Sequence, residues 1–201
     1  MQVFLESNFL LQLAFRQESY PLCERILRGA GPDSYVLHVP QYALTEVFQK
    51  LRPLRNERDE AQKYLVAEIA KHLREEDSDA NAMDDLTRAL NTLLSARTES
   101  QTQRLYAVAA EIAQLAPGPA LTAATIQNAL YQERMHRLSP QDALIYASVL
   151  AGLQELPSSS PKLFITSDED FNKPTLRQEL QGYGCKLITD FRSGAGRLGI
   201  L

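Results

Sequence analysis

Residues 2–8, Q-V-F-L-E-S-N, join a short apolar run directly to a carboxylate, Glu6. Residues 162–171, K-L-F-I-T-S-D-E-D-F, repeat this arrangement near the other end of the chain, with Asp168 shortly after the apolar run. Short apolar runs bounded by polar residues are typical of buried strands. In an open parallel sheet the carboxyl ends of the strands meet at one crevice, where ligands bind. The two stretches therefore predict an α/β fold with carboxylates at a shared edge.

Strands and helices alternate along most of the chain, which predicts parallel strands joined by helical crossovers. Two further β-rich runs, 34–39 and 185–189, bring the expected sheet to four strands, with the strand 2–5 in its centre. The helix that follows Pro40 is expected to end before Pro53, because proline interrupts the helical hydrogen bonds. The last residues, 193–201, are expected to form a mobile terminus.

A block of long, charged, amphipathic helices interrupts this alternation from residue 55 to about 119. Its apolar repeats predict three helices, the last over 105–115, and A-P-G-P at 116–119 ends the block. We therefore predict one domain, residues 1–201, with a helical insertion at about 55–119.

The composition is that of a water-soluble α/β protein of 201 residues. No stretch approaches the ~18 consecutive apolar residues of a membrane span, and the start of the chain lacks the pattern of a signal peptide. Two cysteines, Cys23 and Cys185, are too few for a disulfide framework and are expected to be buried thiols. These features predict a cytoplasmic protein with no membrane partner.

The net charge of −4 argues against a nucleic-acid binder, since such proteins usually carry an excess of basic residues. Five acids that we single out below account for this deficit and leave the rest of the chain near neutral. A site that binds divalent cations would therefore weaken the objection. The five acids are Glu6, Glu46, Asp142, Asp168 and Asp170.

Each of these acids has an ordinary structural interpretation as well. Asp142 lies three residues after Ser139 at the start of a helix, which is close to a capping box. Asp168 suits the N-cap of the following turn, and Glu46 suits an exposed position opposite the apolar stripe of its helix. Glu6 is harder to explain in this way, because a carboxylate at the end of a central strand is buried and requires a partner.

Taken together, the acids favour a metal site. Several carboxylates in one crevice cannot all remain charged unless a hard cation lies among them. No P-loop, dinucleotide-binding fingerprint or zinc-ligand spacing is present to suggest another cofactor. The sequence thus indicates a divalent-metal site that acts on phosphates.

The order of these motifs resembles the PIN-domain family over roughly residues 1–54 and 120–190. The resemblance implies a parallel sheet with helices on both faces and an acidic pocket that binds Mg²⁺ or Mn²⁺. It also implies a nuclease that acts on RNA or DNA, often the toxin of a toxin–antitoxin pair. The residues that carry it are Leu5-Glu6-Ser7-Asn8, Glu46, Asp142-Ala143-Leu144-Ile145 and Ile165-Thr166-Ser167-Asp168-Glu169-Asp170-Phe171.

The resemblance also assigns roles to individual residues. The catalytic acids would be Glu6, Glu46, Asp142 and Asp168, and the metal ligands Glu6, Asp142, Asp168 and Asp170. Auxiliary roles fall to Asn8, which would orient Glu6, and to Thr166. Separately, we expect the cations near the mouth of the pocket to contact nucleic acid, namely Arg52, Arg55 and Lys173.

One position departs from the family pattern, because Glu6 stands where the family has an aspartate. The longer side chain adds a free torsion, whereas Mg²⁺ requires near-ideal octahedral geometry. The favoured hypothesis is a metal-dependent ribonuclease, with single-stranded RNA as substrate, an antitoxin-like protein as a partner and a homodimer as its assembly. One alternative is a catalytically weak PIN-like protein that binds RNA or a protein. Another is a different metal-dependent phosphohydrolase, although the first strand lacks the Asp-x-Asp typical of such phosphatases.

Overall fold

The computed structural model describes residues 1–72 and 80–201. The chain forms two compact units, one made of Met1–Val47 together with Leu105–Leu201, and the other of Phe48–Arg104. The first unit contains the sheet and both acid-bearing stretches quoted above. Part of the predicted helical insertion, residues 73–79, lies outside the described residues.

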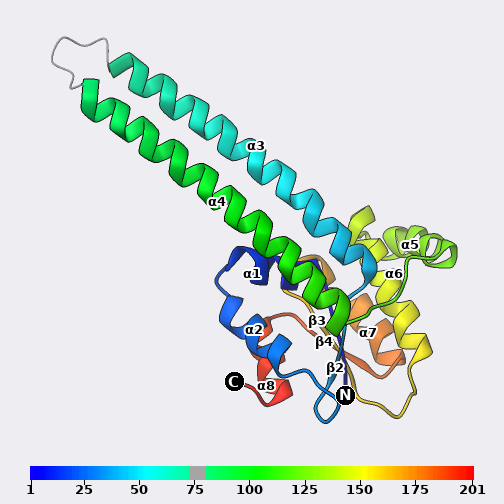
Figure 1. Ribbon diagram of the computed structural model, residues 1–201. Helices are drawn as coiled ribbons and strands as arrows, with labels where there is room; N and C mark the ends of the chain where they lie inside the picture. The colour runs from blue at the N-terminus through cyan, green and yellow to red at the C-terminus, as the bar shows by residue number, and fades with distance from the viewer. Residues whose placement is uncertain (73–79) are drawn as a thin grey trace. The chain divides into compact units, whose positions relative to one another are not determined.

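The first unit is built on a four-stranded parallel sheet with the strand order β2-β1-β3-β4 (Figure 1). β1 and β3 are neighbours, and Leu5 at the end of β1 pairs with Ile165 at the end of β3. The crossovers that leave β1 and β3 run in opposite directions, so the topological switch point lies between them. The prediction of a parallel α/β sheet with the first strand in its interior is confirmed. The strands are β1 Gln2–Leu5, β2 Val36–His38, β3 Lys162–Ile165 and β4 Cys185–Ile188.

Helices cover both faces of this sheet, with α1, α2 and α8 on one side and α5, α6 and α7 on the other (Figure 1). On the first side, the rings of Phe9 and Phe191 pack with centroids 5.9 Å apart. On the second side, Phe171 packs on both Phe164 and Tyr146, with centroids 5.3 and 6.3 Å away. The bounds are α1 Ser7–Phe15, α2 Tyr20–Arg28, α5 Ala123–His136, α6 Pro140–Glu155, η1 Glu169–Phe171, α7 Pro174–Gly182 and α8 Phe191–Leu198.

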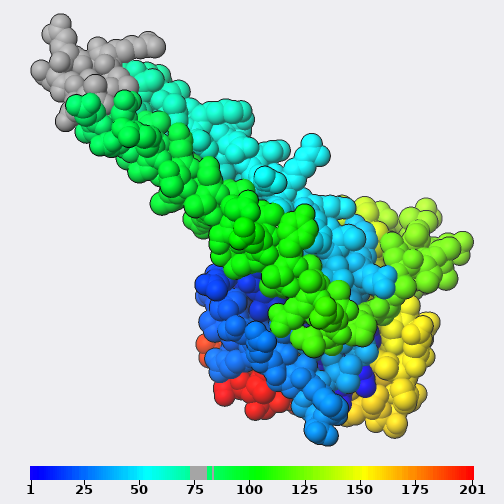
Figure 2. Space-filling view, in the orientation of Figure 1, coloured from blue at the N-terminus to red at the C-terminus, as the bar shows by residue number. Residues whose placement is uncertain are grey.

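Two long helices, α3 (Gln41–His72) and α4 (Ala80–Leu115), supply the second unit; α3 begins in the first unit and α4 ends in it. Within the second unit the two helices pack side by side, as the space-filling view shows (Figure 2). A hydrogen bond of 2.6 Å from Gln62 Nε2 to Asn91 Oδ1 joins them.

Three expectations about helix boundaries are wrong. α3 continues through Pro53. Proline has no N–H to donate to the carbonyl of Gln49 four residues earlier, but both residues are exposed, so water can donate to that carbonyl instead. α4 is one helix where two were predicted. The C-terminal residues form α8, because the small Gly194 lets this helix approach the Ile165 side chain, which a Cβ at position 194 would meet at 2.9 Å.

A short segment, Ala116 to Pro119, runs beside the end of β2. The Val39 amide donates to the Ala116 carbonyl at 3.2 Å, and the Gln41 amide donates to the Pro119 carbonyl at 3.2 Å. A Cβ at Gly118 would lie 1.8 Å from the Val39 carbonyl oxygen, so only glycine permits this approach. The predicted end of the helical block at A-P-G-P is correct, since α4 ends at Leu115.

Cys23 and Cys185 are both free and buried, as expected. Burial raises the pKa of the Cys185 thiol to about 12, so it does not act as a reactive thiolate. Among the described residues, no helix combines the length and apolarity that a membrane span needs.

Candidate active site

Glu6 and Thr166 come together at the topological switch point of the sheet. Each is the first residue after a strand, and the two strands pair in register. The Thr166 hydroxyl donates a hydrogen bond of 3.2 Å to Glu6 Oε1 and accepts one of 2.9 Å from the Asp168 amide. Thr166 therefore links the acid after β1 to the acid after β3.

Glu6 is almost fully buried, with 1% of its surface exposed. It forms the N-cap of α1, where Oε2 accepts hydrogen bonds from the Asn8 amide at 2.6 Å and the Ser7 hydroxyl at 3.2 Å. Burial raises the pKa of the Glu6 carboxyl to about 7; the Asn8 hydrogen bond opposes the rise and the charge of Asp168 adds to it. Asn8 thus contacts Glu6 through its backbone amide.

Asp168 caps the turn that follows it, as its sequence position predicted, and it also lies near other acids. It is the N-cap of η1, and its Oδ1 accepts a hydrogen bond of 2.9 Å from the Asp170 amide. It also lies close enough to Glu6 and Asp142 for its charge to raise the pKa of each. Capping a turn therefore does not remove this carboxylate from the acidic cluster.

Asp142 lies in the first turn of α6, where the predicted N-cap, Ser139, is confirmed. The Asp142 amide donates to Ser139 Oγ at 3.1 Å, and that hydroxyl donates to Asp142 Oδ2 at 2.6 Å. Burial raises the pKa of Asp142, and the hydrogen bond from Ser139 opposes this rise. Further increases come from the charges of other acids, in decreasing order Asp168, Glu46 and Asp170.

Glu46 is buried on α3, with 5% of its surface exposed. The interpretation of Glu46 as an exposed helix residue is therefore wrong. Its side chain faces inward, and its charge raises the pKa of Asp142. The sheet edge thus gathers four acids, each of which repels at least one other: Glu6, Glu46, Asp142 and Asp168.

The N-termini of α1 and α6 partly offset this repulsion. Each helix begins at this edge, with Glu6 and Ser139 as their respective N-caps. The partial positive charge at a helix N-terminus stabilises a nearby carboxylate by roughly 0.3–1 kcal/mol. This is smaller than the effect of burial, which raises the pKa of Glu6 from 4.5 to about 7, so the helix ends do not cancel the cost of charging the cluster.

Within residues 1–72 and 80–201, no three His, Cys, Asp or Glu side chains are close enough to form a ready-made metal cage. The chemistry of the cluster nevertheless fits a hard divalent cation, since its donors are carboxylate oxygens whose mutual repulsion a cation would relieve. Mg²⁺ in particular is commonly held by one or two carboxylates, with water and substrate phosphates completing the shell.

The expected nucleic-acid contacts fall into two groups. Lys173 donates through Nζ to the carbonyls of His136 and Arg137, each at 3.1 Å, at the end of α5. The same ammonium lies 3.7 Å from Asp170 Oδ1. Protein groups therefore already surround Lys173. Arg52 and Arg55 are exposed residues of α3 in the second unit.

Tyr42 belongs to the same cluster, and the sequence interpretation missed it. It is half-buried in the first turn of α3, four residues before Glu46 and on the same helix face. Burial raises the pKa of the Tyr42 hydroxyl, and the charges of Glu46 and Asp142 raise it further. The i to i+4 spacing from Glu46 was the available signal for this residue.

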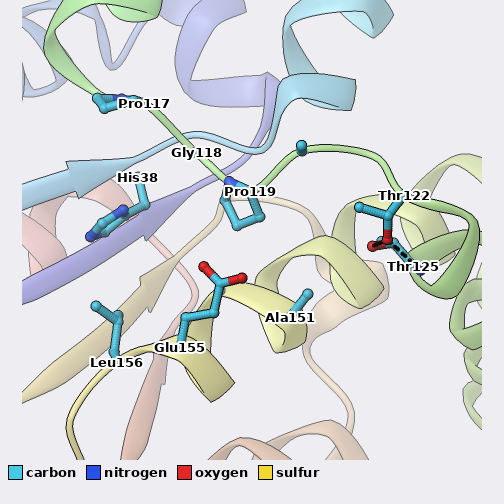
Figure 3. A pocket seen from close by; sticks show the side chains of 11 residues that line it. His38, Pro117, Gly118, Pro119, Thr122, Thr125, Ala151, Glu155 and Leu156 are labelled. Carbon is cyan, nitrogen blue, oxygen red and sulfur yellow. Dashed lines mark hydrogen bonds between the residues drawn. The ribbon is translucent and has the colours of Figure 1, made fainter.

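A separate cavity of about 410 Å³ lies between the end of β2, the segment that follows α4, and the helices α5 and α6 (Figure 3). Its walls are mostly small or apolar, with His38 on one side and the Glu155 carboxylate directed toward Pro119. His38 is held by a contact of 2.6 Å to Gln2 Oε1 and by stacking on Phe4. None of the clustered acids lines this cavity.

Comparison with known protein families gives a match to the PIN domain over residues 3–171. The matched range includes all four clustered acids and Asp170. Comparisons with the curated proteins and with the solved structures gave no match.

Proposed function

Because the chain belongs to the PIN-domain family, we propose that it is a metal-dependent nuclease that hydrolyses phosphodiester bonds of single-stranded RNA. The observation that carries this proposal is the cluster of mutually repelling carboxylates at the switch point of the sheet. Such a cluster destabilises the protein unless it binds something positive. A divalent cation that binds together with a phosphodiester substrate would meet that requirement.

In this proposal Asp142 and Asp168 hold Mg²⁺ or Mn²⁺, with Glu46 and Asp170 as additional oxygen donors. When bound, the cation supplies Lewis acidity that activates a water molecule and stabilises the charge of the leaving oxygen. The protein contributes rigid placement, since caps fix Asp142 to α6 and Asp168 to η1.

Glu6 has a different part in this mechanism. Donors from Ser7, Asn8 and Thr166 already contact both of its oxygens. Glu6 accepts a hydrogen bond from the Thr166 hydroxyl, which in turn accepts one from the Asp168 amide, so Glu6 helps to position the loop that carries Asp168. We therefore propose that Glu6 orients the site and contributes its negative charge, with a direct bond to the cation as its secondary role.

The wider context follows from the same proposal. A ribonuclease of this type would act in the cytoplasm, where two buried free thiols are stable. We also propose that an antitoxin-like protein partner covers the acidic cluster and that the protein forms a homodimer. Co-purification with the products of neighbouring genes would test both proposals.

A second candidate function is a catalytically weak PIN-domain protein that binds RNA or a protein partner. The hydrogen bonds that hold Glu6 favour it, because they limit the freedom of this side chain to complete a metal shell. The substitution of the family's aspartate by the longer Glu6 points the same way.

The test is cleavage of end-labelled single-stranded RNA by the parent and by Asp142→Asn in excess Mn²⁺ or Mg²⁺. We expect at least a 100-fold loss of rate, because a neutral amide is a poor ligand for a hard cation. Asn retains a capping oxygen, so the free energy of unfolding should change by no more than about 1 kcal/mol. The matched control is Glu155→Gln, an acid of the separate cavity, which should cut like the parent.

Two outcomes would count against the mechanism. If Asp142→Asn cuts at the parental rate, Asp142 is only a helix cap. If the parent cuts no RNA or DNA with Mn²⁺ in excess, the binding function becomes the better description.

A further inference from the structure

Tyr42 stands apart from the other residues of the acidic cluster because its half-buried side chain is aromatic and carries no charge at neutral pH. Within the described part of the chain, its hydroxyl makes no hydrogen bond, although its carbonyl accepts one of 2.7 Å from Thr45. A tyrosine hydroxyl can both donate and accept a hydrogen bond, so one without a protein partner at the protein surface is available to a ligand. The position therefore offers a flat apolar face and a free polar tip beside the carboxylates.

The negative charges around the site favour a contact with the substrate that does not depend on charge. A nuclease must hold a polyanion next to carboxylates, and many do so with lysine and arginine. Here Lys173 is already engaged by two backbone carbonyls and by Asp170. Stacking of bases on aromatic rings is the other general source of affinity for single strands, and it does not depend on phosphate charge.

We propose that Tyr42 is a substrate-positioning residue whose ring stacks on the nucleobase next to the scissile phosphate. This inference rests on the proposed function, because it requires a single strand at the acidic cluster. Tyr42 lies one helical turn before Glu46, so a base stacked on it would place the adjoining phosphate toward Glu46 and Asp142. Single-stranded bases are free to stack in this way, whereas the paired bases of a duplex are not.

The experiment measures binding of a labelled single-stranded RNA by fluorescence anisotropy. All proteins carry Asp142→Asn to stop cleavage, and Mn²⁺ is present throughout. Tyr42→Leu should weaken binding about 5- to 100-fold, whereas Tyr42→Phe should stay within about threefold of the parent. Tyr131→Leu, at an exposed tyrosine of α5, is the matched control and should bind like the parent.

A second ligand makes the test independent of whether Tyr42→Leu folds. The ligands are a series of RNAs, each with one abasic nucleotide at a different position along the strand. For one position of the abasic nucleotide, the parent should bind the RNA as weakly as Tyr42→Leu binds intact RNA; at the other positions its affinity should be unchanged. Tyr42→Leu should no longer distinguish that RNA from the intact one.

Equal binding of intact and abasic RNAs by the parent, or parental affinity in a folded Tyr42→Leu, would overturn the inference and leave the nuclease proposal standing. Binding that depends on Tyr42, combined with no cleavage by the protein with Asp142 intact, would overturn the nuclease proposal alone. If the parent binds no single strand, both are wrong.

Discussion

The two edges of the parallel sheet each bury a charged side chain, and the surroundings of the two charges differ. At the carboxyl edge, Glu6 is 1% exposed and lies among other carboxylates. At the amino edge, Lys162 is 3% exposed and lines a cavity of about 330 Å³ between the C-terminal ends of α6 and α7. Its Nζ donates to the carbonyl of Tyr183, the C-cap of α7, at 3.3 Å.

Helix ends explain the difference. A cation is stabilised at a helix C-terminus, and Lys162 is placed near two of them, so its charge is compensated by the fold itself. Glu6 also has a favourable helix end, the N-terminus of α1, yet the neighbouring Asp168 charge works against it. A buried charge that the fold compensates is structural, whereas a buried carboxyl with a strongly raised pKa is a candidate for a binding site.

The largest effect that would sharpen this contrast is the pH dependence of stability without divalent cations. The folded-state pKa of Glu6, about 7, exceeds its ordinary value of 4.5. Its contribution to stability is therefore fully present below about pH 4.5 and is lost as the pH rises through 7, by about 3 kcal/mol in total. Glu6→Gln, which keeps a capping oxygen, should remove this loss and make the protein more stable than the parent at pH 8. Urea unfolding at pH 5 and pH 8 measures it, and parallel losses in both proteins would contradict the assignment.

A slightly smaller effect should follow from adding the cation. A ligand that binds only the folded protein, at a free concentration of 100 times its dissociation constant, raises the free energy of unfolding by about 2.7 kcal/mol. Thermal unfolding with and without Mn²⁺ should therefore show a stabilisation in the parent and in Lys162→Met, but little in Asp142→Asn. A Mn²⁺ shift retained in Asp142→Asn would place the cation elsewhere.

Lys162→Met should cost about 1–2 kcal/mol of stability, since it keeps the apolar stem but removes the hydrogen bond and the charge at the helix ends. Chemical unfolding gives the loss, and RNA cleavage per folded molecule should equal that of the parent. If cleavage falls more than the folded fraction does, the amino edge is not purely structural.

The smallest effect concerns the cap at the acidic edge. Ser139→Ala removes the hydroxyl that accepts the Asp142 amide, with an expected loss of about 1 kcal/mol. Ser139→Thr retains the hydroxyl and serves as the control. Unchanged stability of Ser139→Ala would mean that another group caps α6.

The sheet was predictable because its signals are local. Each strand is a short apolar run closed by turn residues, and the residues that pair at the ends of β1 and β3 belong to such runs. The start of α6 was equally local, with Ser139 as cap and Pro140 in the first turn. Grouping of the acids at one edge then followed from parallel topology, which fixes where strand ends meet.

What escaped prediction depends on tertiary context. Pro53 continues a helix because its surroundings are exposed, and Gly194 packs on Ile165 although glycine suggested mobility. The inward direction of Glu46 reverses what the apolar stripe of its own helix indicates. Tyr42 was missed because a single tyrosine has no sequence pattern of its own; only the placement of Glu46 reveals it.

The pairing of Val39 with Pro117, which Gly118 permits, has a consequence for chain length. The polypeptide leaves the sheet after Val39 and returns beside it at Pro117. The structure of the sheet therefore does not depend on how many residues lie between these two points. Loop-closure entropy changes by only about 0.6 kcal/mol for each doubling of a flexible loop. Removing equal numbers of turns from α3 and α4 within the second unit should therefore leave the sheet and its acidic edge assembled, which makes this junction a natural place to graft a different module.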